Sequence, residues 1–150
     1  MGRADDATAA TFRTTFRLDE LTIWHDEHWT ISVRPAQPTV GSLVISATQP
    51  HLDFQDLSAE EQAALTQCFA RVEHLAVQDL GATRINLLCL MMKDPIVHFH
   101  VLPRYPDRRS RFGVTWDDAG WPGPPDLGAV HELPDGTLEA MCEEFRDLLQ

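Results

Sequence analysis

The segment PIVHFHVLPRY, residues 95–105, decides the fold of this chain and holds its most informative side chains. Its apolar residues recur at every second position, which is the period of a β-strand. On that period Phe99 faces one way, while Ile96, His98 and His100 face the other. The rise of a strand places the two imidazole rings roughly 6 to 7 Å apart along one face.

A pair of histidines on one strand face has three uses that the segment alone leaves open. Either ring can be a core histidine that is hydrogen-bonded to the backbone. The two rings can also bind a metal ion when a third ligand comes from elsewhere, and His51 and His131 are the candidates for it. In phosphate chemistry, one ring attacks phosphorus while the other holds oxygen atoms or handles a proton.

The segments around the histidines predict an α+β domain, with a meandering antiparallel sheet of about five strands and helices packed on one face. Extended patterns bounded by turn residues predict strands at 21–24, 29–33, 43–45, 84–92 and 96–104. A central helix is expected from Ser58, where Glu61 completes a capping box, to Gly81. Thr137 is expected to cap a C-terminal helix, and the Pro- and Gly-rich stretch 113–136 to be irregular.

Length and composition predict one domain over residues 1–150. Of the 150 residues, 43% are hydrophobic, which suits a single core, and the small and polar residues 1–10 are expected to be flexible. No segment approaches the roughly 20 apolar residues of a membrane span and the N-terminus lacks a signal-peptide pattern, so a cytoplasmic protein is expected. Cys68, Cys89 and Cys142 lie too far apart to suggest a disulfide framework or a zinc site.

The formal net charge of −11 argues against nucleic acid as a partner, because most of the surface would repel it. No membrane partner is expected either. The run RYPDRRSR, residues 104–111, is a local exception that holds four of the 12 lysines and arginines. Such a run by itself is typical of a solvated loop. Its place directly after the two histidines also suggests that it attracts a phosphate-bearing ligand.

The histidine strand and its neighbours resemble the histidine triad (HIT) superfamily of nucleotide hydrolases and transferases. The resemblance lies in HFHVLPRY, in RINL on the preceding strand and in DLSAEE at the start of the central helix. The family signature is three histidines at alternate positions followed by two apolar residues and often by Pro-Arg. His98 and His100 match the second and third histidines, and Ile96 stands at the first. The resemblance extends from the hairpin near Trp24 to GWPGPP and implies a HIT-like fold.

The resemblance also implies roles for particular side chains. The middle histidine of the family attacks the α-phosphate and forms a nucleotidyl-histidine intermediate, a role that falls to His98. His100 would contact phosphate or assist the leaving group. Asn86, His51 and Trp121 stand where family members place substrate-binding residues. The implied activity is cleavage of a nucleotide phosphoanhydride or a nucleoside monophosphate conjugate by a cofactor-free homodimer.

Two features depart from the family pattern. The side chain of Ile96 cannot form a hydrogen bond, so another group must orient the nucleophile. The usual glycine-rich approach is replaced by LMMKDPIV, in which Lys93 is a candidate cation. These departures keep two further hypotheses open, a non-catalytic protein that binds a nucleotide or a phosphorylated metabolite, and a protein with a metal ion bound by histidines.

Overall fold

A five-stranded antiparallel sheet forms the centre of the computed structural model, which describes residues 2–129 and 131–150. Its strands are β1 (Thr22–His25), β2 (Trp29–Val33), β3 (Leu43–Ala47), β4 (Arg84–Leu88) and β5 (His98–Arg104). They pair in the order β1-β2-β3-β5-β4, and each pair is antiparallel. The histidine strand β5 therefore lies inside the sheet and β4 at its edge. The α+β class and the five strands predicted from the sequence are confirmed.

Two helices cover one face of the sheet, as the sequence predicts. They are α3 (Ala59–His74), which continues as the π-helical turn η2 (Leu75–Asp79), and α4 (Thr137–Leu148). The capping box of α3 is present: the Ser58 hydroxyl accepts from the Glu61 N–H at 3.1 Å, and Glu61 accepts from the Ser58 N–H at 2.9 Å. The predicted cap of α4 is wrong, because Gly136 holds that position and Thr137 is already helical.

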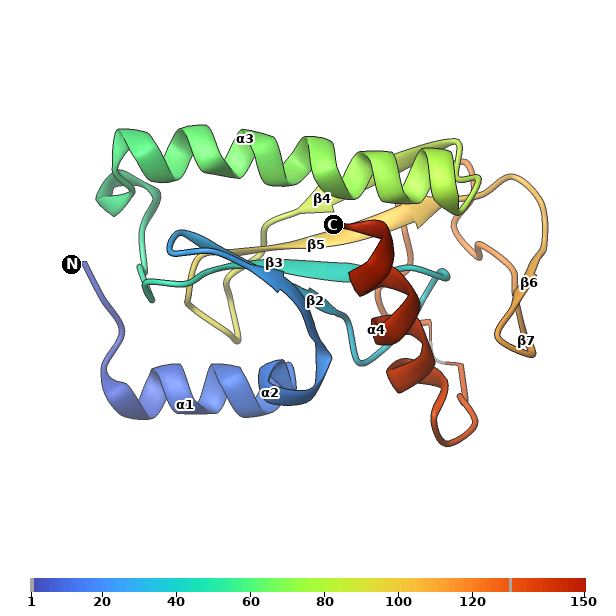
Figure 1. Cartoon of the computed structure of the whole chain (residues 1–150), viewed down its shortest axis with the longest axis horizontal. Helices are drawn as coiled ribbons and strands as arrows, with labels where there is room; N and C mark the ends of the chain where they lie inside the picture. The colour runs from blue at the N-terminus through green and yellow to red at the C-terminus, as the bar shows by residue number, and fades with distance from the viewer. Residues whose placement is uncertain (1, 130) are drawn as a thin grey trace.

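The opposite face of the sheet is covered by a helix that the sequence did not predict. Figure 1 shows α1 (Asp6–Thr15) and the short α2 (Leu18–Leu21) on the side of the sheet away from α3. Asp5 caps α1 by accepting from the Thr8 N–H at 2.7 Å. Phe12, Phe16 and Leu18 pack with Val44 and Ile96 in a second, smaller hydrophobic cluster. The second half of the end expected to be flexible, residues 6–10, is thus helical.

The segment after β5 is also more regular than the sequence predicts. It forms a hairpin of β6 (Arg109–Arg111) and β7 (Val114–Trp116). A separate short 3-10 turn, η1 (Phe54–Asp56), lies before α3. Trp116 is buried and its indole N–H donates to the Gln37 carbonyl at 2.9 Å, which anchors the hairpin to the main domain. No helix in the described part of the chain is long and apolar enough to cross a membrane.

Candidate active site

The two histidines of β5 lie side by side in the interior of the sheet. His98 pairs with Ser46 of β3, and His100 with Val44 on the same strand and Leu88 of β4. Their ring centroids are 5.1 Å apart, and only 2% of His98 and 7% of His100 is exposed to solvent. Strand pairing therefore fixes the backbone beneath His100 from both sides and beneath His98 from the β3 side.

The main chain of Ile96 orients the first ring. Nδ1 of His98 donates to the Ile96 carbonyl oxygen at 2.6 Å. The neutral ring then carries its lone pair on Nε2, which accepts no hydrogen bond from any described residue. Any amino acid supplies this carbonyl, so the apolar side chain at position 96 does not deprive the ring of an orienting partner. That side chain packs in the cluster under α1 instead, and β5 begins two residues after it.

We expect a histidine introduced at position 96 to destabilise the protein without improving the site. Ile96 is buried, and the Phe12, Phe16 and Val44 side chains around it offer no hydrogen-bond partner. Ile96→His should therefore lower the free energy of unfolding by about 2 to 4 kcal/mol, measured by urea denaturation. Ile96→Val, which shortens the side chain without adding a polar group, should cost about 0.5 to 1.5 kcal/mol. A stable Ile96→His variant would contradict this packing.

A cavity of about 440 Å³ opens in front of the two rings. Its lining is Thr15, Phe16, Arg34, Leu90, Met91, Met92, Lys93, Asp94, His98, His100 and Leu127. The Phe16 ring centroid lies 5.4 Å from that of His98 and 6.1 Å from that of His100. The sequence did not predict Arg34, Phe16 or Leu127 as site residues. Ser32 pairs with Val44, and Val44 pairs with His100. Arg34 lies two residues after Ser32 and so continues the same face, but this relation follows only once the strand order is known.

Both rings are held neutral near pH 7. Burial lowers the pKa of His98, against an opposing effect of its bond to Ile96 and of the charge of Asp94. Burial, with the positive charge of Arg34 and the neighbouring His98, lowers the pKa of His100 to about 4. A neutral imidazole is a nucleophile, so the site is poised for attack and not for binding through a charged imidazolium.

The low pKa of His100 should make stability depend on pH. A histidine whose pKa falls from 6.5 to about 4 on folding stabilises the native state above pH 6.5, and that contribution is lost as the pH falls from 6.5 toward 4. Between pH 7 and pH 5 the loss should be about 2 kcal/mol. Urea titrations of the wild type and His100→Gln at both pH values isolate it, since carboxylates contribute equally to both. If the free energy of unfolding changed with pH equally in the two proteins, the low pKa of His100 would be contradicted.

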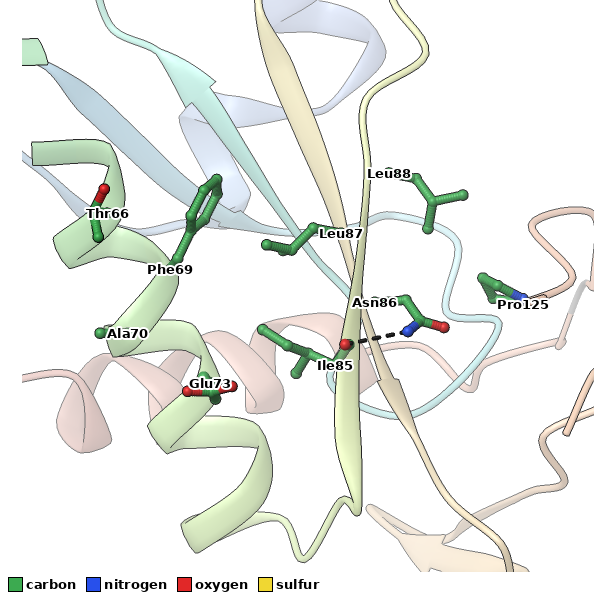
Figure 2. A pocket seen from close by; sticks show the side chains of 9 residues that line it. All are labelled: Thr66, Phe69, Ala70, Glu73, Ile85, Asn86, Leu87, Leu88 and Pro125. Carbon is green, nitrogen blue, oxygen red and sulfur yellow. Dashed lines mark hydrogen bonds between the residues drawn. The ribbon is translucent and has the colours of Figure 1, made fainter. Parts of the chain in front are cut away.

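The other predicted site residues lie outside this cavity. Asn86 is on the same sheet face as His100, but its Oδ1 accepts from Arg104 at 2.6 Å and its Nδ2 donates to the Ile85 carbonyl. In Figure 2 the Asn86 side chain points away from α3, toward Pro125. Asn86 and Trp121 together line a separate cavity of about 420 Å³.

His51 is engaged elsewhere in the fold. Its Nε2 lies 2.8 Å from a carboxylate oxygen of Glu61, the residue that also completes the capping box of α3. Its carbonyl accepts from the Val97 N–H at 2.9 Å, just before β5. The side chain does not reach the cavity of His98 and His100, so His51 ties the start of α3 to the entry of the histidine strand.

The arginine run of residues 104–111 does not line the histidine cavity, contrary to the expectation that it attracts a ligand there. Arg104 is buried against Asp118, and Arg108 pairs with Asp117 at the surface. Arg109 donates to the Gly81 carbonyl, and Arg111 pairs with Glu144. The cations in the cavity are instead Arg34 and Lys93.

The metal hypothesis finds no ligand set in the structure. Within residues 2–129 and 131–150, no group of three or more histidine, cysteine or acidic side chains is placed to hold an ion. His51 is bonded to Glu61, and the His131 ring lies against Trp116 with centroids 5.9 Å apart. Neither therefore joins His98 and His100 as a third ligand.

Comparisons with known proteins rest on structure alone. No protein-family model matches the chain, and no curated protein is similar enough in sequence to match. Among solved structures, a histidine triad protein of Bradyrhizobium japonicum is 17% identical with a TM-score of 0.66, and one of Marinobacter aquaeolei VT8 is 16% identical with a TM-score of 0.69. In both cases the match covers 99% of this chain and 96% of the other.

A third similar structure is a hypothetical histidine triad nucleotide-binding protein of Sulfolobus tokodaii. It is 14% identical, has a TM-score of 0.65, and the match covers 93% of this chain and 91% of that one. At such identities the likeness shows the fold and not the activity. The five-stranded sheet, the central helix and nearly the whole length of the chain are shared, so this protein has the histidine triad fold.

Proposed function

We propose that this protein cleaves a nucleotide phosphoanhydride, or a related nucleoside monophosphate conjugate, through a nucleotidyl-histidine intermediate on His98. The observation that carries the proposal is the neutral His98 ring, held through Nδ1 by the Ile96 carbonyl beside a cavity that also contains His100 and Arg34. The nucleotide as substrate is further supported by the fold, since the similar protein of Sulfolobus tokodaii is described as nucleotide-binding.

The proposed chemistry has two steps. The Nε2 lone pair of His98 forms a bond to phosphorus while the bond to the leaving oxygen breaks, and the leaving group departs with that electron pair. The ring then carries a positive charge, which the Ile96 carbonyl stabilises at Nδ1–H. Water next attacks phosphorus, the P–N bond breaks, the neutral ring is restored, and one proton passes to solvent.

The experiment that tests the proposal is intact-mass spectrometry of the protein quenched in acid-free buffer during reaction with a panel of nucleotide conjugates. We expect a mass increase of one nucleotidyl group that maps to the peptide containing His98. Turnover without an adduct on that peptide would reject the covalent route. Binding of a nucleotide measured by calorimetry, with neither adduct nor turnover, would favour the second hypothesis, a non-catalytic binding protein. The observation that supports this alternative is the close packing of the Phe12 and Phe16 rings against His98.

We also propose that two copies pair through β4. This edge strand has one neighbour only, and 38% of Leu87 on it is exposed. Figure 2 shows Leu87 and Ile85 pointing toward α3, where Phe69 and Ala70 complete a groove of about 630 Å³ along the strand. Sedimentation should give a dimer for the wild type and a monomer for Leu87→Lys. A wild-type monomer at micromolar concentration would reject the pairing.

The proposed compartment is the cytoplasm. Its support is that Cys68, Cys89 and Cys142 are all free thiols, two of them buried in the core. Thiol titration of protein freshly prepared from its native host should give three reduced cysteines after unfolding. Recovery of an intermolecular disulfide would count against this assignment.

A further inference from the structure

Arg34 is a cation in the histidine cavity without an acidic partner. Its Nε donates to Nδ1 of His100 at 3.2 Å and its Nη1 donates to the Ala36 carbonyl at 2.9 Å. No carboxylate in residues 2–129 or 131–150 lies within ion-pair distance of it, and none of these residues accepts from its Nη2. Arg104 on β5, by contrast, is paired with Asp118. The Arg34 guanidinium is therefore committed to the His100 ring on one side and free on another.

This contact determines where His100 carries its proton. A guanidinium has no lone pair, so Nδ1 of His100 must be the acceptor and the proton of the neutral ring must be on Nε2. His98 has the opposite arrangement, because its Nδ1 donates to the Ile96 carbonyl. The two rings thus present different atoms to a ligand, a lone pair on His98 and an N–H on His100.

We propose that Arg34 is a positioning residue that holds His100 as a hydrogen-bond donor through Nε2–H, and that the site is thereby selective for substrates whose leaving group departs as an anion. The proposal rests on the proposed function for the identity of the reaction. If neutral His100 gave up its Nε2 proton, the ring would become an imidazolate anion, because its Nδ1 carries no proton and already accepts from Arg34. His100 therefore stabilises the departing oxygen by a hydrogen bond and does not protonate it.

The leaving group must then be stable without an added proton. A phosphate group, whose last pKa is about 6, departs as an anion near neutral pH. An amine leaving group must be protonated before the P–N bond breaks, and an alkoxide is a much stronger base than phosphate. Phosphoanhydrides are therefore the favoured class, over phosphoramidates and simple phosphodiesters. The positive charge of Arg34 would also suit the additional negative charge of a phosphate leaving group.

The charged and titratable groups around His100 come from three elements. Arg34 follows β2, His98 lies on β5, and the loop before β5 contributes Lys93 and Asp94 to the same cavity. Of these, Arg34 makes the hydrogen bond to the ring, and its charge opposes protonation of His100. Removal of Arg34 should therefore free Nδ1, allow both tautomers and raise the pKa of His100 toward the ordinary value.

Nitrogen-15 NMR of the histidine rings tests the positioning role directly. In the wild type at pH 7, we expect His100 to show a protonated Nε2 and an unprotonated Nδ1, with the reverse in His98. Arg34→Met and Arg34→Lys should mix the tautomers of His100 and move its titration to higher pH, because lysine cannot reproduce the planar Nε–H donor. Arg108→Met, which removes an exposed arginine, is the control and should change neither ring. An unchanged His100 in Arg34→Met would overturn the proposal.

Kinetics test the selectivity. With a phosphoanhydride and a phosphoramidate of the same nucleoside, we expect the wild type to show at least about 10-fold higher kcat/KM for the anhydride, and Arg34→Met to lose about 10- to 100-fold in kcat on it. Equal turnover of the two, or preference for the phosphoramidate, would overturn the selectivity. If neither substrate is turned over and no adduct forms, the proposed function fails, and the NMR result still decides whether Arg34 sets the tautomer of His100.

Discussion

Replacement of His98 by alanine is expected to lower kcat by about 10⁴-fold or more on any nucleotide substrate that the wild type cleaves. In the proposed mechanism this ring supplies the bond to phosphorus, and its Nδ1 is already engaged by the Ile96 carbonyl, which leaves Nε2 for the attack. We do not expect His100 to replace it, since Nδ1 of that ring accepts from Arg34 and the proton of the neutral ring is on Nε2. Single-turnover kinetics with radiolabelled substrate measure the loss.

The matched control for this prediction is His74→Ala, which removes an exposed histidine at the end of α3. It should retain the wild-type kcat. Circular dichroism and urea denaturation should confirm that His98→Ala is folded under the assay conditions. Activity within about 10-fold of the wild type in His98→Ala would remove this residue from the mechanism.

The second large effect is on stability, and its origin is the buried pair of Arg104 and Asp118. Their side chains are 5% and 2% exposed, and Asp118 accepts from Arg104 Nε at 2.7 Å as well as from the Tyr105 N–H at 3.2 Å. Asp118→Ala leaves a guanidinium buried without its counterion. We expect the free energy of unfolding to fall by about 3 to 5 kcal/mol, measured as a shift of the urea midpoint.

The neighbouring residue provides the control. Asp117 pairs with Arg108 at the surface, where the two side chains are 66% and 69% exposed, so Asp117→Ala should cost less than about 1 kcal/mol. The double variant Arg104→Met/Asp118→Leu should recover much of the stability lost in Asp118→Ala, because it leaves no unpaired charge. Equal costs at positions 117 and 118 would show that burial of the ion pair contributes nothing.

Local patterns predicted the parts of the fold in which neighbours in sequence decide the structure. The period of two in residues 96–104 gave the shared face of His98 and His100, and Ser58 with Glu61 gave the start of α3. Helix α1 was missed for the opposite reason. Phe12 is its one buried residue, and that side chain packs in a cluster with Val44 and Ile96, which are distant in sequence.

The candidate site was predicted less completely, because several of its contacts join distant segments. Arg34 and His100 are 66 positions apart in sequence, and nothing local indicates that β2, β3 and β5 lie side by side in that order. Composition was misleading for the arginine run, whose members are taken up by partners such as Asp118 and Glu144. A cluster of charges in sequence does not reveal the acids that the fold brings to it.

The hydrogen bond from His98 to the carbonyl of residue 96 has a consequence for how such proteins are recognised. The bond depends on the backbone path before β5, because its acceptor is a main-chain carbonyl that any residue at position 96 would supply. A motif that demands a histidine there excludes chains that keep the orienting bond. Descriptions of this kind of site would be more inclusive if they required two histidines at alternate strand positions and left the first position free.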